Sequence, residues 1–132
     1  RSIEVDISAL EDPDASKADL IDGSIGELSL FQETFGYYAQ GVTPQTAILP
    51  DGWRKRLVAF KTPATNGVTA LCLEPHDLWI SKAIAGRQKD IEFCNALLSI
   101  KMVKASTLKK RLNKVQKLQQ ERRDRVCRCM QA

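Results

Sequence analysis

Apolar and polar residues alternate strictly over residues 2–8, where the chain opens. A period of two predicts a half-buried strand, because successive side chains of a strand point to opposite faces. The apolar face would consist of Ile3, Val5 and Ile7. Glu4 and Asp6 would share the other face, so this strand is expected to present a pair of neighbouring carboxylates.

The pattern changes after the acidic stretch that ends this strand. Apolar residues at helical spacing predict a helix from about Ser16, with Ser16 or Asp14 as its cap. Residues 35–49 hold strand-forming side chains together with a glycine and a proline, which predicts two short strands or one strand with an irregular edge. A hairpin that pairs 57–61 with 68–73 follows.

Helical patterns fill the second half of the chain. Pro75 and Gly86 mark the start and the end of one predicted helix, and Asp90 begins another. Ser106 is expected to cap a third helix that runs through Leu118, and a last helix covers most of the remaining residues. Strands followed by helices indicate an α+β fold with a small mixed sheet.

Charge is distributed unevenly, although the net charge is only +4. Residues 1–66 hold 6 Lys and Arg against 10 Asp and Glu, whereas residues 67–132 hold 14 against 6. Within 101–132 the balance is 11 to 2, which indicates a basic helical segment. Such a segment either faces a polyanion or is simply a solvated, lysine-rich helix face, and the second interpretation is favoured from charge alone.

The four cysteines form no CxxC pair, and Cys127 and Cys129 are too close in sequence for a comfortable disulfide on a helix. We interpret them as reduced thiols of a cytoplasmic protein, with Cys72 and Cys94 packing as small hydrophobic residues. A zinc site would need a distant ligand such as His76 and is disfavoured. No apolar run approaches the roughly 20 residues that span a bilayer, so no membrane is expected as a partner.

Two groups of residues are candidates for chemistry. Glu4 and Asp6 could share a divalent cation, although acidic residues are also common on solvent-facing strands. Lys82, Arg87 and Asp90 cluster around a glycine between two helices, a mixture that suits phosphate binding but equally suits a brace between the helices. For His76, which lacks a partner motif, packing at the helix start is favoured over a role as general base.

The stretch LEPHDLWISKAIAGRQKDIEF at 73–93 resembles a motif of small bacterial nucleotidyltransferase-like proteins. These belong to the DNA polymerase beta-like superfamily, whose members include nucleotidyltransferase toxins of abortive-infection systems. The opening RSIEVDIS resembles the strand that carries the acidic pair of that superfamily, and FGYYAQGV and LPDGWRKRLV are also similar to this group. The resemblance implies a nucleotidyltransferase-like domain over 1–100, with the basic segment 101–132 appended.

Matched position by position, the resemblance implies that Glu4 and Asp6 bind the metal. It implies that Lys82 and Asp90 act in catalysis, and that Lys82 and Arg87 bind the nucleotide. All of these residues are then expected to meet in one cleft.

The chain departs from the family pattern in two places. The first carboxylate of the pair is Glu rather than the commoner Asp, and the Gly-Ser phosphate-binding motif that should precede the acidic strand is expected to be missing from this sequence. A third acidic ligand is not assigned, and Glu74 and Asp77 are the candidates.

The resemblance therefore implies transfer of a nucleoside monophosphate from an NTP, with Mg²⁺ or Mn²⁺ as cofactor. The partners would be the nucleotide and an acceptor such as RNA, a protein or a small molecule, and an oligomer is left open. Two alternatives of other classes stand beside this function. One is a non-catalytic, antitoxin-like or regulatory partner protein, and the other is a nucleic-acid-binding module that acts through the basic segment.

Overall fold

The computed structural model describes residues 2–131, which fold into two compact units with the boundary between Ala47 and Ile48. Both units combine helices with a short two-stranded sheet, and the α+β class expected from the sequence is confirmed. Each unit is described by itself below. The expected division into a domain over 1–100 and a basic segment over 101–132 stays a prediction.

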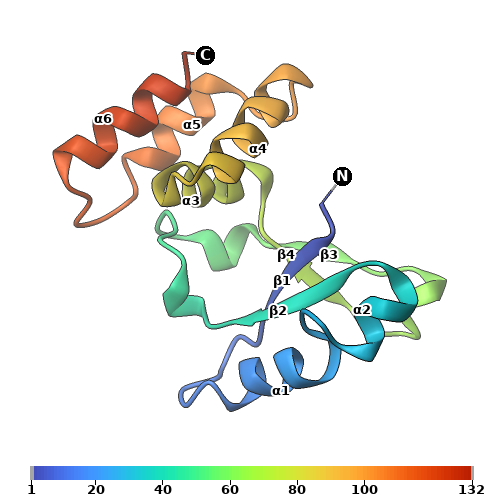
Figure 1. Cartoon of the computed structure of the whole chain (residues 1–132). Coiled ribbons are helices and arrows are strands. Elements are labelled where there is room, and N and C mark those ends of the chain that lie inside the picture. The colour runs from blue at the N-terminus through green and yellow to red at the C-terminus, as the bar shows by residue number, and fades with distance from the viewer. Residues whose placement is uncertain (1, 132) are drawn as a thin grey trace. The chain divides into compact units, whose positions relative to one another are not determined.

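The first unit is a parallel strand pair with two helices in the crossover between its strands (Figure 1). Strand β1 (Glu4–Ser8) pairs with β2 (Tyr38–Val42), and the crossover holds α1 (Ser16–Ile25) and α2 (Leu30–Phe35). Parallel strands require such a crossover, because a tight turn can join only antiparallel neighbours. The predicted strand in 35–49 is thus one strand, followed by a 3₁₀ turn at Pro44–Thr46.

Helix α1 packs closely on one face of β2. A Cβ atom on Gly41 would overlap the carbonyl oxygen of Ala18, so only glycine permits this approach. The Gly41 amide also donates a hydrogen bond of 2.7 Å to Oδ1 of Asp22, and Ala39 is buried beneath the helix. Residues at alternate positions lie on opposite faces, so Tyr38 on β2 and its partner on β1 face away from α1.

Two details of this unit correct the expectations from sequence. The apolar face expected for this strand is not buried, since Val5 and Ile7 of β1 are 52% and 38% exposed and Ile3, just before it, is 58% exposed, in a sheet of two described strands. Asp14 accepts a hydrogen bond of 3.1 Å from the amide of Ser16, as one of the expected caps would, and the buried carboxylate of Asp12, which was not expected, accepts from the amides of Lys17 and Ala18. A short loop before the helix allows this more distant carboxylate to reach the first turn.

The second unit begins with the hairpin that the sequence predicts. Strands β3 (Val58–Phe60) and β4 (Ala70–Cys72) pair antiparallel, and the loop between them turns through Asn66 and Gly67, both with positive φ. Its strands are shorter than the predicted 57–61 and 68–73. Cys72 lies exposed on β4, so the expectation that it packs as a small hydrophobic residue is wrong.

Four helices form the main core of the second unit (Figure 1). They are α3 (Pro75–Ala85), α4 (Gln88–Ser99), α5 (Ala105–Leu112) and α6 (Gln120–Cys129). Helix α3 packs against the other three, and its Trp79 and Ile80 are fully buried. The C-terminal basic segment therefore shares one core with the helices before it.

Reciprocal hydrogen bonds tie α3 to α4 within this core. The Trp79 indole Nε1 donates to the carbonyl of Cys94 at 3.0 Å, and the Cys94 thiol donates to the carbonyl of Trp79 at 3.5 Å. Burial of the thiol raises the pKa of Cys94 to about 12, which keeps it protonated and unreactive. The expected packing role of Cys94 is thus confirmed.

Helix α5 differs from its prediction at both ends. Its cap position is Lys104 rather than Ser106, and it ends at Leu112 rather than Leu118. The guanidinium of Arg123 on α6 donates to the carbonyl oxygens of Leu112 and Val115, which satisfies groups that a longer helix would have paired internally. The amides of Lys114 and Val115 also donate to the carbonyls of Arg111 and Leu112 at 2.9 and 3.0 Å, so local turns close the helix and the contact with Arg123 reinforces its end. Among the described residues, no helix has the length and apolar character needed to cross a membrane.

Candidate functional site

Glu4 and Asp6 lie on the same face of β1, as the sequence predicts. The strand has no bulge, and Glu4 is paired with Tyr38 and Asp6 with Gln40 in the parallel register. Both carboxylates therefore lie on the face that α1 leaves uncovered. Glu4 is half-buried and Asp6 is exposed, so a ligand could approach this pair from solvent.

Tyr38 holds the carboxylate of Glu4 in place. Its phenolic hydroxyl donates a hydrogen bond of 2.7 Å to Oε2 of Glu4. This bond, with a smaller contribution from desolvation, raises the pKa of Tyr38 to about 12, because ionisation of the phenol would place two negative charges together. Sequence reasoning missed Tyr38, and only the register of the parallel pair shows that it faces Glu4.

We expect the titration of Tyr38 to report this contact directly. In a Tyr37→Phe variant, which leaves Tyr38 as the sole tyrosine, the phenol should titrate at about 12 rather than at its ordinary value of 10.0. Adding Glu4→Gln should move the midpoint back towards 10.0, because the neutral amide no longer opposes the phenolate. Ultraviolet absorbance of the phenolate measures both midpoints, and equal midpoints would contradict the contact.

The chemistry of this pair suits a hard divalent cation. Mg²⁺ prefers carboxylate oxygens and is usually held by one or two carboxylates together with substrate phosphates and water. Glu4 and Asp6 supply two carboxylates in a strand geometry that brings them close together. Within the part of the chain that the structure describes, no group of three or more His, Cys, Asp or Glu residues could enclose a metal ion. The donor set therefore fits Mg²⁺ that is shared with a substrate, and it does not fit a closed structural site.

Lys82, Arg87 and Asp90 come together where α3 is followed by α4. The carboxylate of Asp90 is almost fully buried, and it accepts hydrogen bonds from the Arg87 side chain at 2.7 Å and from the Arg87 amide at 3.2 Å. The Lys82 ammonium lies 4.0 Å from the same carboxylate. Burial raises the pKa of Asp90, but the bonds from Arg87 and the charge of Lys82 outweigh burial and hold it below its ordinary value.

This arrangement matches the brace that the sequence offers as an alternative to nucleotide binding. Asp90 joins the two helices, since Lys82 belongs to α3 and Arg87 precedes α4. Arg87 is 58% exposed in spite of these bonds, so its guanidinium is accessible to solvent. Lys82, Arg87 and Asp90 belong to the second unit and the acidic pair of β1 to the first, and their meeting in one cleft stays a prediction.

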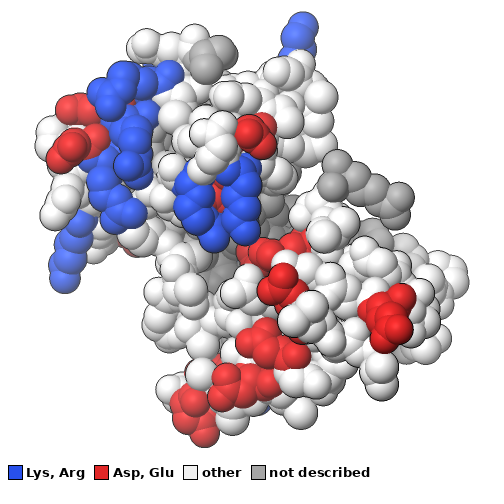
Figure 2. Space-filling model, in the orientation of Figure 1, with Lys and Arg blue, Asp and Glu red and all other residues white. Residues whose placement is uncertain are grey.

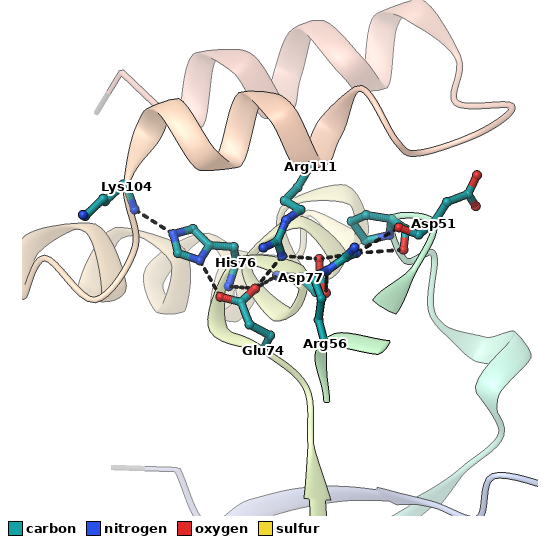
Figure 3. Close-up of polar contacts among 8 residues, drawn as sticks. Asp51, Arg56, Glu74, His76, Asp77, Lys104 and Arg111 are labelled. Carbon is teal, nitrogen blue, oxygen red and sulfur yellow. Dashed lines mark hydrogen bonds and ion pairs between the residues drawn. The ribbon is translucent and has the colours of Figure 1, made fainter. Parts of the chain in front are cut away.

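A larger polar cluster, which the sequence does not predict, surrounds the buried carboxylate of Asp77 (Figure 3). Arg56 donates to it twice, with Nε at 2.8 Å from Oδ2 and Nη2 at 3.0 Å from Oδ1. Arg111 of α5 donates to Oδ1 at 2.9 Å. Arg56 also donates to the carbonyl oxygen of Asp51 at 3.0 Å. Asp77 thus joins the start of α3 to α5 and to the 3₁₀ turn at Trp53–Arg56.

Glu74 and His76 extend this cluster along the start of α3. Glu74 caps the helix through the amides of His76 and Asp77, and it accepts a bond of 2.6 Å from Arg111. The His76 ring lies between Oε1 of Glu74, 2.6 Å from Nδ1, and the amide of Lys104, 3.0 Å from Nε2 (Figure 3). Because Nε2 accepts, the neutral ring carries its proton on Nδ1. The packing role expected for His76 agrees with these contacts.

These contacts bear on the unassigned third acidic ligand. Burial raises the pKa of Glu74, but hydrogen bonds from His76 and Arg111 outweigh it and hold the pKa below its ordinary value. Asp77 has no exposed surface and is paired with two guanidinium groups. Both carboxylates are therefore committed to structural bonds. The sequence gives no sign of this, because Arg56 and Arg111 lie 21 and 34 positions away from Asp77.

Basic side chains gather on the surface that α5 and α6 form (Figure 2). Counted by unit, residues 1–47 hold 2 Lys and Arg against 9 Asp and Glu, and residues 48–132 hold 18 against 7. Part of this positive charge is structural. Arg122 and Arg125 both donate to the carbonyl of Ile84 at the end of α3, where a cation also interacts favourably with the helix dipole.

The chain is thus a small α+β protein that carries two neighbouring carboxylates on one strand. Over residues 5–131 the chain matches a family described as nucleotidyltransferase of unknown function (DUF6036), and it belongs to that family. The resemblance to nucleotidyltransferase-like proteins is confirmed at this level. Searches of curated proteins and of solved structures give no significant match.

Proposed function

We propose that this chain supplies the acidic pair of a metal-dependent nucleotidyltransferase, which transfers a nucleoside monophosphate from an NTP to an acceptor. The observation that carries the proposal is the shared face of Glu4 and Asp6 on β1, turned away from α1. Membership of a family described as a nucleotidyltransferase supports it independently. The relation to abortive-infection toxins, and RNA or a protein as acceptor, are parts of the same proposal.

Within this proposal, Glu4 and Asp6 hold Mg²⁺ or Mn²⁺. When bound, such an ion neutralises the charge on the phosphates and orients them. Tyr38 positions the carboxylate of Glu4 through the hydrogen bond that its hydroxyl donates. Asp6 is exposed on the same face of β1 and supplies the second carboxylate.

Lys82, Arg87 and Asp90 are proposed to bind and orient the nucleotide. The contacts within this group support a positioned cation, because the buried carboxylate of Asp90 fixes the side chain of Arg87. A fixed guanidinium binds a phosphate at a smaller cost in side-chain entropy than a flexible one. The brace between α3 and α4 and the binding of phosphate are therefore compatible roles.

The test is an assay with the complete protein and NTPs labelled in the α-phosphate. We expect label to be transferred to an acceptor in the presence of Mg²⁺ and the transfer to be abolished by a chelator. Candidate acceptors are total RNA, a protein fraction and the protein itself. Transfer that persists in the chelator would contradict the metal-dependent mechanism.

The basic face of α5 favours one of the alternatives. Lys109 and Lys110 on α5, and Lys114 shortly after it, are exposed and would be available to a polyanion. A nucleic-acid-binding module would bind RNA with an affinity that falls steeply with salt, and it would lose affinity when these lysines are changed to Gln. An unchanged affinity and salt dependence would leave the lysines as solvated residues of a structural helix.

A further inference from the structure

Three arginines of α6 line a hollow of about 290 Å³ in the second unit, together with Glu121. They are Arg122, Arg125 and Arg128, which follow one another at intervals of three residues and so lie on one side of the helix. Helical geometry separates them by roughly 4.5 Å each along the axis. Like charges held so close together repel one another, which makes the hollow a favourable place for an anion.

Two of these guanidinium groups are held in place by the end of α3. Arg122 donates to the carbonyl oxygen of Ile84 at 3.1 Å and Arg125 donates to it at 2.9 Å. Gly86 has a positive φ of 68°, and a Cβ atom there would lie 2.7 Å from Nη2 of Arg125, so the guanidinium rests against the glycine. The cationic groups are therefore ordered before any ligand arrives.

The bonds to Ile84 leave much of the donor capacity of these arginines unused. A guanidinium carries five N–H donors, and each of these two gives one nitrogen to Ile84 in the bonds described above. Among the described residues, Arg125 Nε is the buried side-chain nitrogen without a hydrogen-bond partner. Arg128 is exposed at the edge of the hollow. The contacts to the end of α3 account for Arg122 and Arg125, but they do not account for the third arginine, Arg128, in the same hollow.

We propose that this hollow is a binding site for a diphosphate or triphosphate group, either as free pyrophosphate or as the tail of a nucleotide. Guanidinium groups bind phosphate oxygens in a bidentate manner, and three arginines against one glutamate leave an excess of positive charge that a multiply charged anion offsets. The hollow lies at the lower end of the volumes of small-molecule sites, which suits a phosphate chain without a buried base.

A nucleic-acid strand fits this surface less well. Glu121 and Asp124 are exposed on the same helix and interrupt the positive strip that a long polyanion would follow. The site concerns the second unit alone, and it stands apart from the metal-dependent transfer proposed above. The two proposals can therefore fail separately.

Calorimetric titration of the complete protein with pyrophosphate, in the absence of divalent cations, tests the site. Arg128→Gln should weaken binding about tenfold, because it removes a charge-assisted hydrogen bond without touching the contacts to Ile84. Glu121→Gln should tighten binding several-fold, because it removes the negative charge of the hollow. Lys109→Gln on α5 is the matched control, since it removes one exposed positive charge outside the hollow and should leave the affinity unchanged.

Sulfate at equal ionic strength, a nucleoside triphosphate and RNA complete the experiment. Sulfate that binds more weakly than pyrophosphate supports the site. If Arg128→Gln lowers the affinity for the nucleoside triphosphate as much as it lowers the affinity for pyrophosphate, the natural ligand is the phosphate tail of a nucleotide. Equal losses in the Arg128→Gln and Lys109→Gln variants would overturn the proposal, as would RNA binding without pyrophosphate binding. Because the titration contains no divalent cation, its result does not depend on the metal-dependent transfer, which separates this test from that of the proposed function.

Discussion

Asp6→Asn is expected to reduce nucleotidyl transfer at least about a hundredfold while leaving the fold intact. The substitution keeps the size of the side chain and removes the charge that would hold the cation. Asp6 is exposed on β1 and caps no helix, so its loss should cost little stability. The measurement is the rate of transfer from a labelled NTP as a function of Mg²⁺ concentration, with circular dichroism to follow the fold.

Asp19→Asn provides the matched control for this prediction. Asp19 is an exposed aspartate of the same unit, on α1, and α1 covers the face of the sheet opposite to Glu4 and Asp6. The same chemical change there should leave the rate within about a factor of two, since its effect on stability is small. Equal rates for Asp6→Asn and the wild type would remove the carboxylate pair from the mechanism.

Asp77→Asn is expected to destabilise the protein by about 3–5 kcal/mol. The carboxylate has no exposed surface, and both of its oxygens accept bonds from the guanidinium groups of Arg56 and Arg111. A neutral amide would remove the carboxylate that faces Arg56, which is only 19% exposed, and would leave Arg111, which is 17% exposed, with Glu74 as its counter-charge. Urea unfolding at neutral pH measures the difference in free energy.

Asp51→Asn tests whether this effect is specific to the buried carboxylate. Asp51 also contacts Arg56, but through its backbone carbonyl, and its own exposed side chain accepts a hydrogen bond from Gln116 that the oxygen of an asparagine can still accept. Its substitution should therefore change the free energy of unfolding by no more than about 0.5 kcal/mol. A loss below about 1 kcal/mol for Asp77→Asn would show that the cluster contributes less than a buried ion pair does.

Local patterns were sufficient to predict most elements of this fold. Alternation over 2–8 predicts β1, and the turn through Asn66 and Gly67 predicts the hairpin of β3 and β4. Proline at the start of α3 and glycine at its end set the bounds of that helix, because proline fits a first helical turn and Gly86 adopts the positive φ of a C-terminal cap. These signals act within a few residues of one another.

Two predictions from the sequence, the end of α5 and the burial of one face of β1, differ from the structure. The sequence predicts an end at Leu118 because the apolar stripe continues that far, whereas the helix ends at Leu112, whose carbonyl accepts from the amide of Val115 in a tight turn and from the guanidinium of Arg123. Similarly, the alternation in β1 predicts that one face of the strand is buried, but the apolar side chains of that face are exposed. Burial depends on which elements pack against a face, and the pattern alone does not supply them. No local rule anticipates either outcome.

The sequence by itself determined the α+β class and the shared face of Glu4 and Asp6, because spacing within one strand settles which side chains are neighbours. Only the tertiary structure decided that Tyr38 orients Glu4 and that Arg56 and Arg111 enclose Asp77. For α6, the sequence shows only that the helix is basic. The tertiary structure decides which of its arginines donate to the last carbonyls of α3. Such partners are separated by tens of residues, and their contacts follow from packing rather than from periodicity.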